Sequence, residues 1–223
     1  MQFGVMMHRD LENREAGIFN RCFGSRAGRI VEIGCGNGRL TCHLEKHAES
    51  VLGLDPCEAD LDQARQCVGT AVQLAVGSGE DIPLEDGACD AVVFTLSLHH
   101  QDSARALKEA ARTLNAKGRI LVIEPKANTL GANLFAVIDD ESHRYVIAEA
   151  AIQDSGLKVV DYGDVLIHWT FEDYNEMVEY IFGYYGLNPD PERESAMAAL
   201  MGARKNDIPL IVEDETRFWL LEP

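Results

Sequence analysis

The sequence predicts an α/β fold in which helices cover both faces of a doubly wound, mostly parallel sheet. Two observations predict it: short apolar runs recur at near-even spacing, and segments with helical periodicity separate most of them. Apolar runs of this kind are typical of strands buried on both faces, and helical crossovers keep such strands parallel. The expected strands cover 29–34, 51–55, 71–76, 90–96 and 119–125.

Helical segments are expected between these strands and beyond them. Asp102 is a favourable N-cap residue, and Leu107, Ala110 and Leu114 follow it on one helical face. After Pro125 the regular alternation of strands and helices ends. The expected helices cover 39–49, 57–68, 102–114 and 142–151, and a further strand covers 157–168.

The C-terminal third contains an aromatic-rich helix within "TFEDYNEMVEYIFGYYG". Thr170 and Asp173 have the spacing of a capping box, and Gly186 is expected to end the helix. A second helix is expected to carry Pro191 in its first turn, and the chain closes on a strand or hairpin over 209–223.

We expect a single domain over 1–223, with a helical insertion over 170–206. The insertion has two interpretations. Its apolar positions recur at helical spacing, which is typical of one more helix packed on the sheet. Alternatively, it is a lid that walls water away from a substrate, with Trp169 and Phe171 near its hinge.

Composition excludes several classes of partner. The chain has 223 residues, of which 46% are hydrophobic, and a formal net charge of -17. So acidic a surface repels nucleic acid and anionic membranes. No apolar run approaches the ~18 residues of a membrane span, and the first residues lack the features of a secretion signal. The six cysteines form no CxxC pair, so we expect reduced thiols in a cytoplasmic protein.

The segment "VEIGCGNGRL" places Gly34, Gly36 and Gly38 where the first strand turns into a helix. Glycine there permits positive φ and close approach of a ligand, while the helix start presents N–H groups. Asp55 ends the second strand, where a carboxylate can accept hydrogen bonds from both hydroxyls of a ribose. The pattern indicates a nucleoside-containing cofactor.

Two cofactor classes fit this pattern. A dinucleotide fingerprint, G-x-G-x-x-G, would require glycine at position 39, where Arg39 stands. A cofactor without a phosphate needs only the close approach, and Glu32 would suit a cationic amino group. The acid at position 55 does not discriminate, because both classes carry a ribose.

Four segments together resemble class I S-adenosylmethionine-dependent methyltransferases. They are "VEIGCGNGRL", "GLDP", "GSGEDIPLEDGACDAVVFTLSLHHQD" and "ALKEAARTLNAKGRILVIEP", within residues 29–125. The group most resembled includes the ubiquinone- and menaquinone-biosynthesis enzymes. The resemblance implies a seven-stranded Rossmann-like sheet. It also implies transfer of a methyl group from S-adenosyl-L-methionine to a small-molecule acceptor, with S-adenosyl-L-homocysteine as product. Because the surface is acidic, we expect this acceptor to be neutral or cationic.

The resemblance also implies the cofactor-binding positions. Ser78 stands where the family usually has an acid, which leaves recognition of the adenine edge open. The implied set is Glu32, Gly34, Cys35 and Gly36 at the methionine moiety, Asp55 at the ribose, Pro56 at the adenine face, Ser78, Gly79 and Glu80 in the third loop, and Leu96 and Ser97 closing the pocket.

Few residues are candidates for acid–base chemistry. His99 and His100 follow the fourth strand and are candidate general bases for an acceptor that must lose a proton; the alternative is a structural pair. Glu124 ends the fifth strand, where it could reach the substrate or cap a neighbouring segment. His43 and His47 have metal-ligand spacing, but without a third ligand we expect a solvated or half-buried face and no metal site.

Two other functions remain open at this stage. The chain could bind S-adenosylmethionine without catalysis and act through a protein partner. Less favoured is a nicotinamide-dependent oxidoreductase, because the third glycine of the dinucleotide fingerprint is missing. A terminal strand with an exposed face could also support a homodimer.

Overall fold

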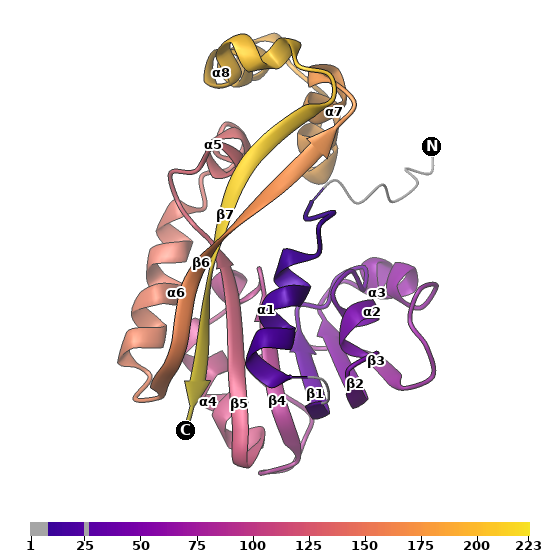
Figure 1. The fold of residues 1–223 in the computed structure, drawn as a ribbon, viewed down its shortest axis with the longest axis vertical. Coiled ribbons are helices and arrows are strands. Elements are labelled where there is room, and N and C mark those ends of the chain that lie inside the picture. Colours follow the sequence, from indigo (N-terminus) through magenta and orange to yellow (C-terminus); the bar gives the residue numbers. More distant parts are fainter. Residues whose placement is uncertain (1–8, 25–26) are drawn as a thin grey trace. The chain divides into compact units, whose positions relative to one another are not determined.

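The computed structural model describes residues 9–24 and 27–223 (Figure 1). Residues 1–8, on which the expectation of no secretion signal rests, lie outside the described residues. Contacts divide the chain into two compact units. The sheet unit comprises Glu15–Glu124, Arg144–Asp164 and Arg217–Pro223. The aromatic unit comprises, among the described residues, Arg9–Arg14, Pro125–His143 and Val165–Thr216.

The described chain forms one seven-stranded sheet in the order β3-β2-β1-β4-β5-β7-β6, which confirms the predicted fold class. β1 to β5 run parallel to one another, and β7 runs antiparallel to its neighbours. All five strands predicted before Pro125 are present, as are both later ones. The strands are β1 (Ala27–Ile33), β2 (Ala48–Asp55), β3 (Val72–Val76), β4 (Cys89–Thr95), β5 (Leu114–Pro125), β6 (Lys158–Phe171) and β7 (Leu210–Glu222).

The register brings the carboxyl ends of the central strands to one edge of the sheet. Ile33 of β1 pairs with Leu54 of β2 on one side and with Phe94 of β4 on the other. The residues that follow these strands therefore meet at that edge, and they include the glycine-rich segment and Asp55. This is where ligands bind in open parallel sheets.

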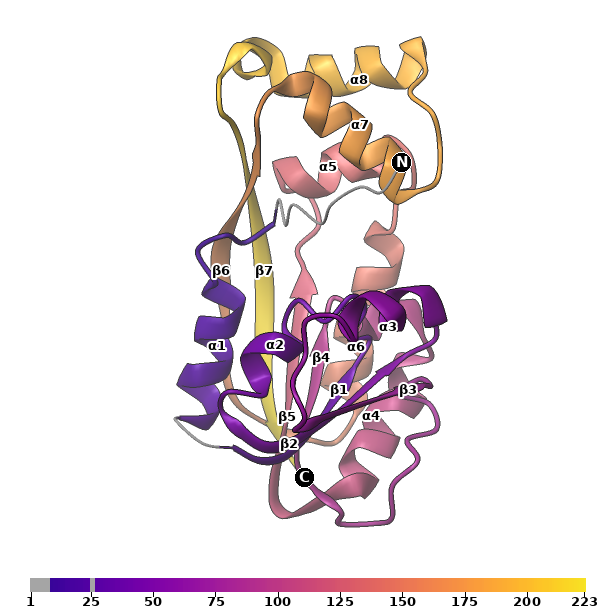
Figure 2. The same cartoon turned by 90° about the vertical axis from the view of Figure 1, so that its right-hand side faces the viewer.

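The helices of the sheet unit cover both faces of its strands. Val31, Phe94 and Ile120 point to one face and pack with Leu107 and Ile152 in a single buried cluster. In Figure 2, α1 and α2 lie on one side of these strands and α4 and α6 on the other. The helices are α1 (Arg14–Phe23), α2 (Thr41–Leu44), α3 (Glu58–Ala64), the 3-10 helix η1 (Leu98–His100), α4 (Ser103–Thr113) and α6 (Ser142–Asp154).

In the sheet unit, two predicted helices are shorter than expected, and one α-helix was not predicted. The segments 39–49 and 57–68 contain only α2 and α3. β2 begins at Ala48, which pairs with Ala27, so the chain must leave its helix before that point. In contrast, α4 matches the prediction, and Asp102 caps it by accepting a hydrogen bond from the Arg105 N–H. The unpredicted helix is α1.

The aromatic unit contains α5 (Leu130–Ala136), α7 (Tyr174–Tyr184), α8 (Pro191–Met201) and η2 (Gly202–Asn206). The predicted capping box at Thr170 and Asp173 is wrong by about one turn. β6 continues to Phe171, so Asp173 is the N-cap of α7 and accepts from the Glu176 N–H at 3.0 Å. Gly186 follows the helix end with φ +67°, as predicted.

Other features of this unit follow the sequence more closely. Pro191 is the first residue of α8, and Asp190 caps that helix through the Arg193 N–H. α5 was not predicted. Large side chains from α5, β6 and α7 share a buried cluster that includes Leu134, Trp169 and Phe182. Whether the segment 170–206 serves as a lid stays a prediction.

Among the described residues, no helix has both the length and the apolar character that crossing a membrane requires.

Candidate functional site

The turn after β1 needs glycine at position 34 because two strand ends meet there. Gly34 has φ +71°, and a Cβ on it would lie 2.3 Å from the Cβ of Ser97. The Ser97 hydroxyl donates to the Ile33 carbonyl at 2.6 Å, which fixes the end of β4 against the end of β1. The bare side of Gly34 is therefore filled by the protein's own Ser97. Its φ is positive, as expected, and its part in holding a ligand through the main chain stays a prediction.

Gly36 is the open glycine of the turn. It has φ +51°, and within residues 9–24 and 27–223 no heavy atom beyond its chain neighbours lies within 4 Å of the position that a Cβ would take. Its N–H donates to Asp55 at 2.8 Å. A ligand could thus approach the main chain at Gly36 directly.

Asp55 organises the turn from the end of β2. One carboxylate oxygen accepts from Gly36 N–H and the other from Cys57 N–H, both at 2.8 Å. Asp55 is buried, whereas the adjacent Pro56 is exposed. The Asp55 carboxylate therefore also has a structural part, because it holds two backbone N–H groups. Carboxylate oxygens have further lone pairs that can accept from hydroxyls.

Glu32 is a second buried carboxyl beside the turn. It is 1% exposed and accepts a hydrogen bond from the Thr41 hydroxyl at 2.6 Å. Burial raises the pKa of Glu32 to about 7, although the Thr41 hydrogen bond opposes the rise. Burial also raises the pKa of Cys35, so that thiol fills the turn and is not poised as a nucleophile, as expected.

Arg39, at the position of the missing third glycine, has a structural partner. Its guanidinium lies 2.6 Å from Glu15 of α1, whose side chain is fully buried. Arg39, which occupies the position where a dinucleotide fingerprint requires glycine, thus joins the turn to α1.

The third loop, after β3, is tied to the start of α4. The Gly79 N–H donates to the Gln101 side chain at 2.8 Å, and the Glu80 carboxylate accepts from the Asp102 N–H at 2.7 Å. A Cβ on Gly79 would lie 3.0 Å from Phe94, so the loop packs closely against β4. Ser78, which replaces the family's usual acid, is half-buried in the same loop.

The turn after β4 carries local backbone strain. Leu96 has φ +54°, a conformation that is rare for a residue with a bulky side chain. Its N–H donates to the Ile123 carbonyl at 2.8 Å, which holds the turn in place.

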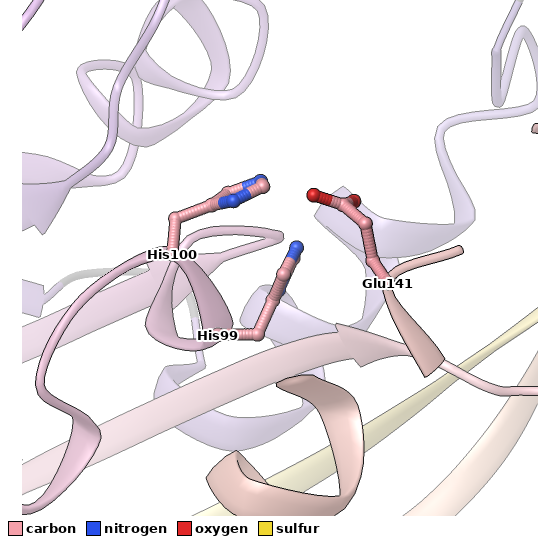
Figure 3. A group of neighbouring side chains, drawn as sticks. All are labelled: His99, His100 and Glu141. Atoms are coloured by element: carbon pink, nitrogen blue, oxygen red, sulfur yellow. The ribbon is translucent and has the colours of Figure 1, made fainter. Parts of the chain in front are cut away.

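The two histidines follow at once in η1 and lie in different environments. His99 is buried and His100 is exposed, with ring centroids 3.9 Å apart. Figure 3 shows both side chains projecting from η1; the third residue drawn, Glu141, belongs to the aromatic unit. The edge of Tyr145, from α6, contacts the His99 ring at a centroid distance of 4.8 Å.

Glu124 turns inward and organises this turn. One carboxylate oxygen accepts from the N–H groups of Ser97 and Leu98, at 3.2 and 2.9 Å, and the other pairs with Nδ1 of His99. Glu124 is 2% exposed, so of its two predicted roles the structure favours capping a neighbouring segment over reaching outward. The His99–Glu124 pair was missed in the sequence. Their positions could have revealed the pair, because His99 follows β4, Glu124 lies near the end of β5, and these two parallel strands are adjacent.

His43 and His47 lie side by side, with ring centroids 4.7 Å apart. Both are half-buried, and Nε2 of His43 lies 3.3 Å from the Asn20 side chain of α1. Burial lowers the pKa of His43, which favours the neutral ring. Both histidines therefore lie on a half-buried face, which is one of the two environments that the sequence predicts for them.

Comparison with known proteins finds a family match over the part of the chain that holds the glycine-rich turn, Asp55 and the histidine pair. Residues 31–122 match the model of a methyltransferase domain. An uncharacterised methyltransferase of Mycobacterium tuberculosis is 38% identical over 106 residues, which cover 47% of this chain and 43% of that protein. Demethylmenaquinone methyltransferase of Corynebacterium kroppenstedtii is 30% identical over 97 residues, covering 43% and 41%. The match thus spans less than half of the length of each relative.

Solved structures extend the likeness to almost the whole chain, as a likeness of fold. The crystal structure of the YcgJ protein of Bacillus subtilis superposes with a TM-score of 0.66 at 16% identity. The superposition covers 94% of this chain and 98% of that one.

Proposed function

We propose that this chain, which carries a class I S-adenosylmethionine-dependent methyltransferase domain, is an active enzyme that methylates a small molecule. The observation that carries the proposal is the open main chain at Gly36, which lies beside the carboxylate of Asp55 and on the turn that follows the buried carboxyl of Glu32 in β1. The proposal covers the activity of the whole chain, its cofactor and its acceptor.

The residues of the turn fit S-adenosyl-L-methionine. Glu32 and the main chain of Gly34, Cys35 and Gly36 would hold the amino-acid end, and Asp55 the ribose diol. An ammonium near Glu32 would favour the ionised carboxylate and lower its raised pKa. Pro56 would lie against the adenine face, Ser78, Gly79 and Glu80 would contribute from the third loop, and Leu96 and Ser97 would close the pocket. When bound, the cofactor supplies an electrophilic methyl group on a sulfonium.

For such a displacement the protein mainly orients the reacting atoms, which alone can contribute several kcal/mol. A base is needed only for an acceptor that must lose a proton. His99 is our candidate for that base, because its Nδ1 pairs with Glu124, which fixes the ring's orientation. His100, exposed beside it, is the second candidate.

For the acceptor we propose a small, neutral or cationic molecule, because the chain's net charge of -17 disfavours anions. We also propose that the domain belongs to the group that includes ubiquinone- and menaquinone-biosynthesis enzymes. The similarity to demethylmenaquinone methyltransferase supports this grouping. The six free thiols support a cytoplasmic location.

Ligand binding tests the proposal. S-adenosyl-L-homocysteine should raise the melting temperature of the full chain, and NAD should not. Asp55→Asn should weaken binding of S-adenosyl-L-homocysteine on the order of 100-fold in calorimetry, because charge-assisted hydrogen bonds to two hydroxyls are lost. Asp62→Asn, an exposed acid on α3, is the matched control and should bind as the wild type does.

Three outcomes separate the alternatives. Stabilisation by NAD alone would favour the oxidoreductase. Binding of S-adenosyl-L-homocysteine without turnover across phenol, thiol, amine and carbon-acid acceptors would favour the silent binding subunit. Unchanged affinity in a folded Asp55→Asn variant would remove Asp55 from the proposed ribose site. Circular dichroism must confirm folding, because Asp55 also holds two backbone N–H groups.

A further inference from the structure

Two cysteines lie in contact beside the glycine-rich turn. Sγ of Cys42, on α2, is 2.8 Å from Sγ of Cys67, which follows the end of α3. A disulfide bond is about 2.0 Å long, so less than an ångström of sulfur movement separates the two thiols from bonding distance. Both are free thiols in the structure.

The pair differs from the other four cysteines in proximity and access. Cys67 is exposed and Cys42 half-buried, whereas Cys22, Cys35 and Cys89 are buried. Cys57 is exposed as well, which makes it a matched control for access alone. An accessible thiol with a second thiol beside it is the arrangement in which a mixed disulfide resolves into an internal one.

We propose that Cys42 and Cys67 form a reversible redox pair that exchanges with low-molecular-weight disulfides such as oxidised glutathione. The Cys67 thiolate attacks one sulfur of the glutathione disulfide, forming a mixed disulfide and expelling one glutathione thiolate. The Cys42 thiolate then attacks Cys67 Sγ, forming the Cys42–Cys67 bond and expelling the second glutathione thiolate. Two electrons pass to glutathione, and the two cysteine protons go to solvent.

The order of the two steps follows from the environment of each sulfur. Burial raises the pKa of Cys42 to about 12, and the neighbouring Cys67 adds to the rise. Cys42 is therefore the poorer initial nucleophile. Once Cys67 is in the mixed disulfide, its sulfur carries no charge. Cys67 then no longer raises the pKa of Cys42 by charge repulsion. Exposed Cys67 attacks first and Cys42 resolves.

The oxidation state of the pair is connected to the turn that holds Gly36. The Cys42 N–H donates to the Gly38 carbonyl at 3.0 Å, and the Cys67 thiol points to the Asn37 carbonyl at 3.7 Å. A Cβ on Gly38 would lie 3.1 Å from Cys67 Sγ. The same thiol also lies 3.3 Å from the Ala64 carbonyl. Oxidation would remove the thiol proton that these two carbonyls can accept and would join α2 to the end of α3 across the turn. The proposed bond itself does not depend on the proposed function.

The experiment equilibrates the full chain in glutathione buffers of graded ratio, traps it with acid and alkylating agent, and maps its peptides without reduction. We expect a linked Cys42–Cys67 peptide, a chain lighter by two hydrogens, and full recovery with dithiothreitol. Closing the chain between residues 42 and 67 should also raise the melting temperature by roughly 5–10 °C.

Three serine variants test the assignment of roles. Cys57→Ser should oxidise as the wild type does. Cys42→Ser should stop at a glutathione adduct on Cys67, and Cys67→Ser should form neither adduct nor link. The proposal is overturned if the folded wild type keeps all thiols alkylatable under oxidising conditions. A wild type that stops at the Cys67 adduct, or that links through Cys57, overturns it as well.

Discussion

Glu124 in the sheet unit and Asp214 in the aromatic unit are both buried carboxylates with several hydrogen-bond donors, but their donors differ in kind. Glu124 accepts from two successive backbone N–H groups and pairs with His99. Asp214 accepts from side chains of three distant segments. Its side-chain donors are Arg9 Nη1 at 3.2 Å, Trp169 Nε1 at 3.0 Å and Thr129 Oγ1 at 2.5 Å, and one backbone N–H, that of the adjacent Glu215, donates at 2.9 Å.

The difference lies in what each carboxylate organises. Glu124 orders a single turn and orients an imidazole, which can gain, lose or move a proton. Asp214 joins the N-terminal segment, α5 and β6 around a guanidinium that keeps its charge. Arg9 also lies 5.1 Å over the Trp169 ring, and Gly131 passes so close that a Cβ there would lie 2.5 Å from Asp214. One carboxylate is suited to chemistry, and the other to stability.

The largest effect is expected from Asp214→Ala, which leaves the buried charge of Arg9 without its carboxylate. Loss of one member of a buried ion pair costs about 3–5 kcal/mol in the free energy of unfolding. Urea unfolding followed by tryptophan fluorescence measures it. Glu213→Ala, at the exposed neighbour on β7, should change stability by no more than about 0.5 kcal/mol.

A matched change at the other carboxylate sharpens the comparison. Glu124→Gln should cost only about 1–2 kcal/mol, because the amide still accepts one hydrogen bond and His99 can change tautomer to suit it. If Glu124→Gln proves as costly as Asp214→Ala, the distinction between the two carboxylates is lost.

Glu32 adds a third buried carboxyl, and its raised pKa predicts a dependence of stability on pH. Below pH 4.5 it is protonated in both states. Between pH 4.5 and about 7 the unfolded chain ionises first and the folded chain retains the proton, so the free energy of unfolding falls by roughly 3 kcal/mol. Above about 7 this contribution is constant.

The comparison of wild type with Glu32→Gln isolates that effect, since contributions of other groups cancel. Urea unfolding at pH 5 and pH 8 should show the wild type losing roughly 2.5 kcal/mol more than the variant across this interval. Equal losses in the two proteins would mean that Glu32 ionises in the folded chain as it does in the unfolded one.

The change expected at His99 is one of turnover and not of stability. His99→Gln should lower kcat on the order of 100-fold with hydroxyl or carbon-acid acceptors, because the candidate base is lost. The same variant should keep its rate with an acceptor that needs no proton removal, such as a tertiary amine. His100→Gln is the neighbouring control. Equal rates in both variants and the wild type would make the histidine pair structural.

The strands before Pro125 could be predicted because each is a short apolar run between turn residues, a local property. The N-caps at Asp102 and Asp190 are local too. The start of α7 was misplaced because β6 continues through Thr170, and strand length depends on pairing with neighbours. α1 was not predicted because the charged residue Glu15 interrupts its apolar face in the sequence. In the folded chain Glu15 is buried on that face and pairs with Arg39.

The candidate site divides in the same way. Gly34, Gly36, Asp55 and the histidine pair could be selected from residue type and position, because strand ends of a parallel sheet meet at one edge. That Gly34 makes room for Ser97, and that Glu124 belongs to His99, could not be selected in this way.

The sequence by itself determined the parallel sheet, the glycine-rich turn and the acid at the end of β2, because these depend on backbone conformation and on residues near one another in the chain. Only the tertiary structure decided the partners of the buried carboxyls and the contact of Cys42 with Cys67. The pairs His99–Glu124, Cys42–Cys67 and Arg9–Asp214 join residues 25 to 205 positions apart. The environment of a buried charge or thiol is set by the residues that folding packs around it. Neither the residue type nor the spacing in the sequence shows which residues these are.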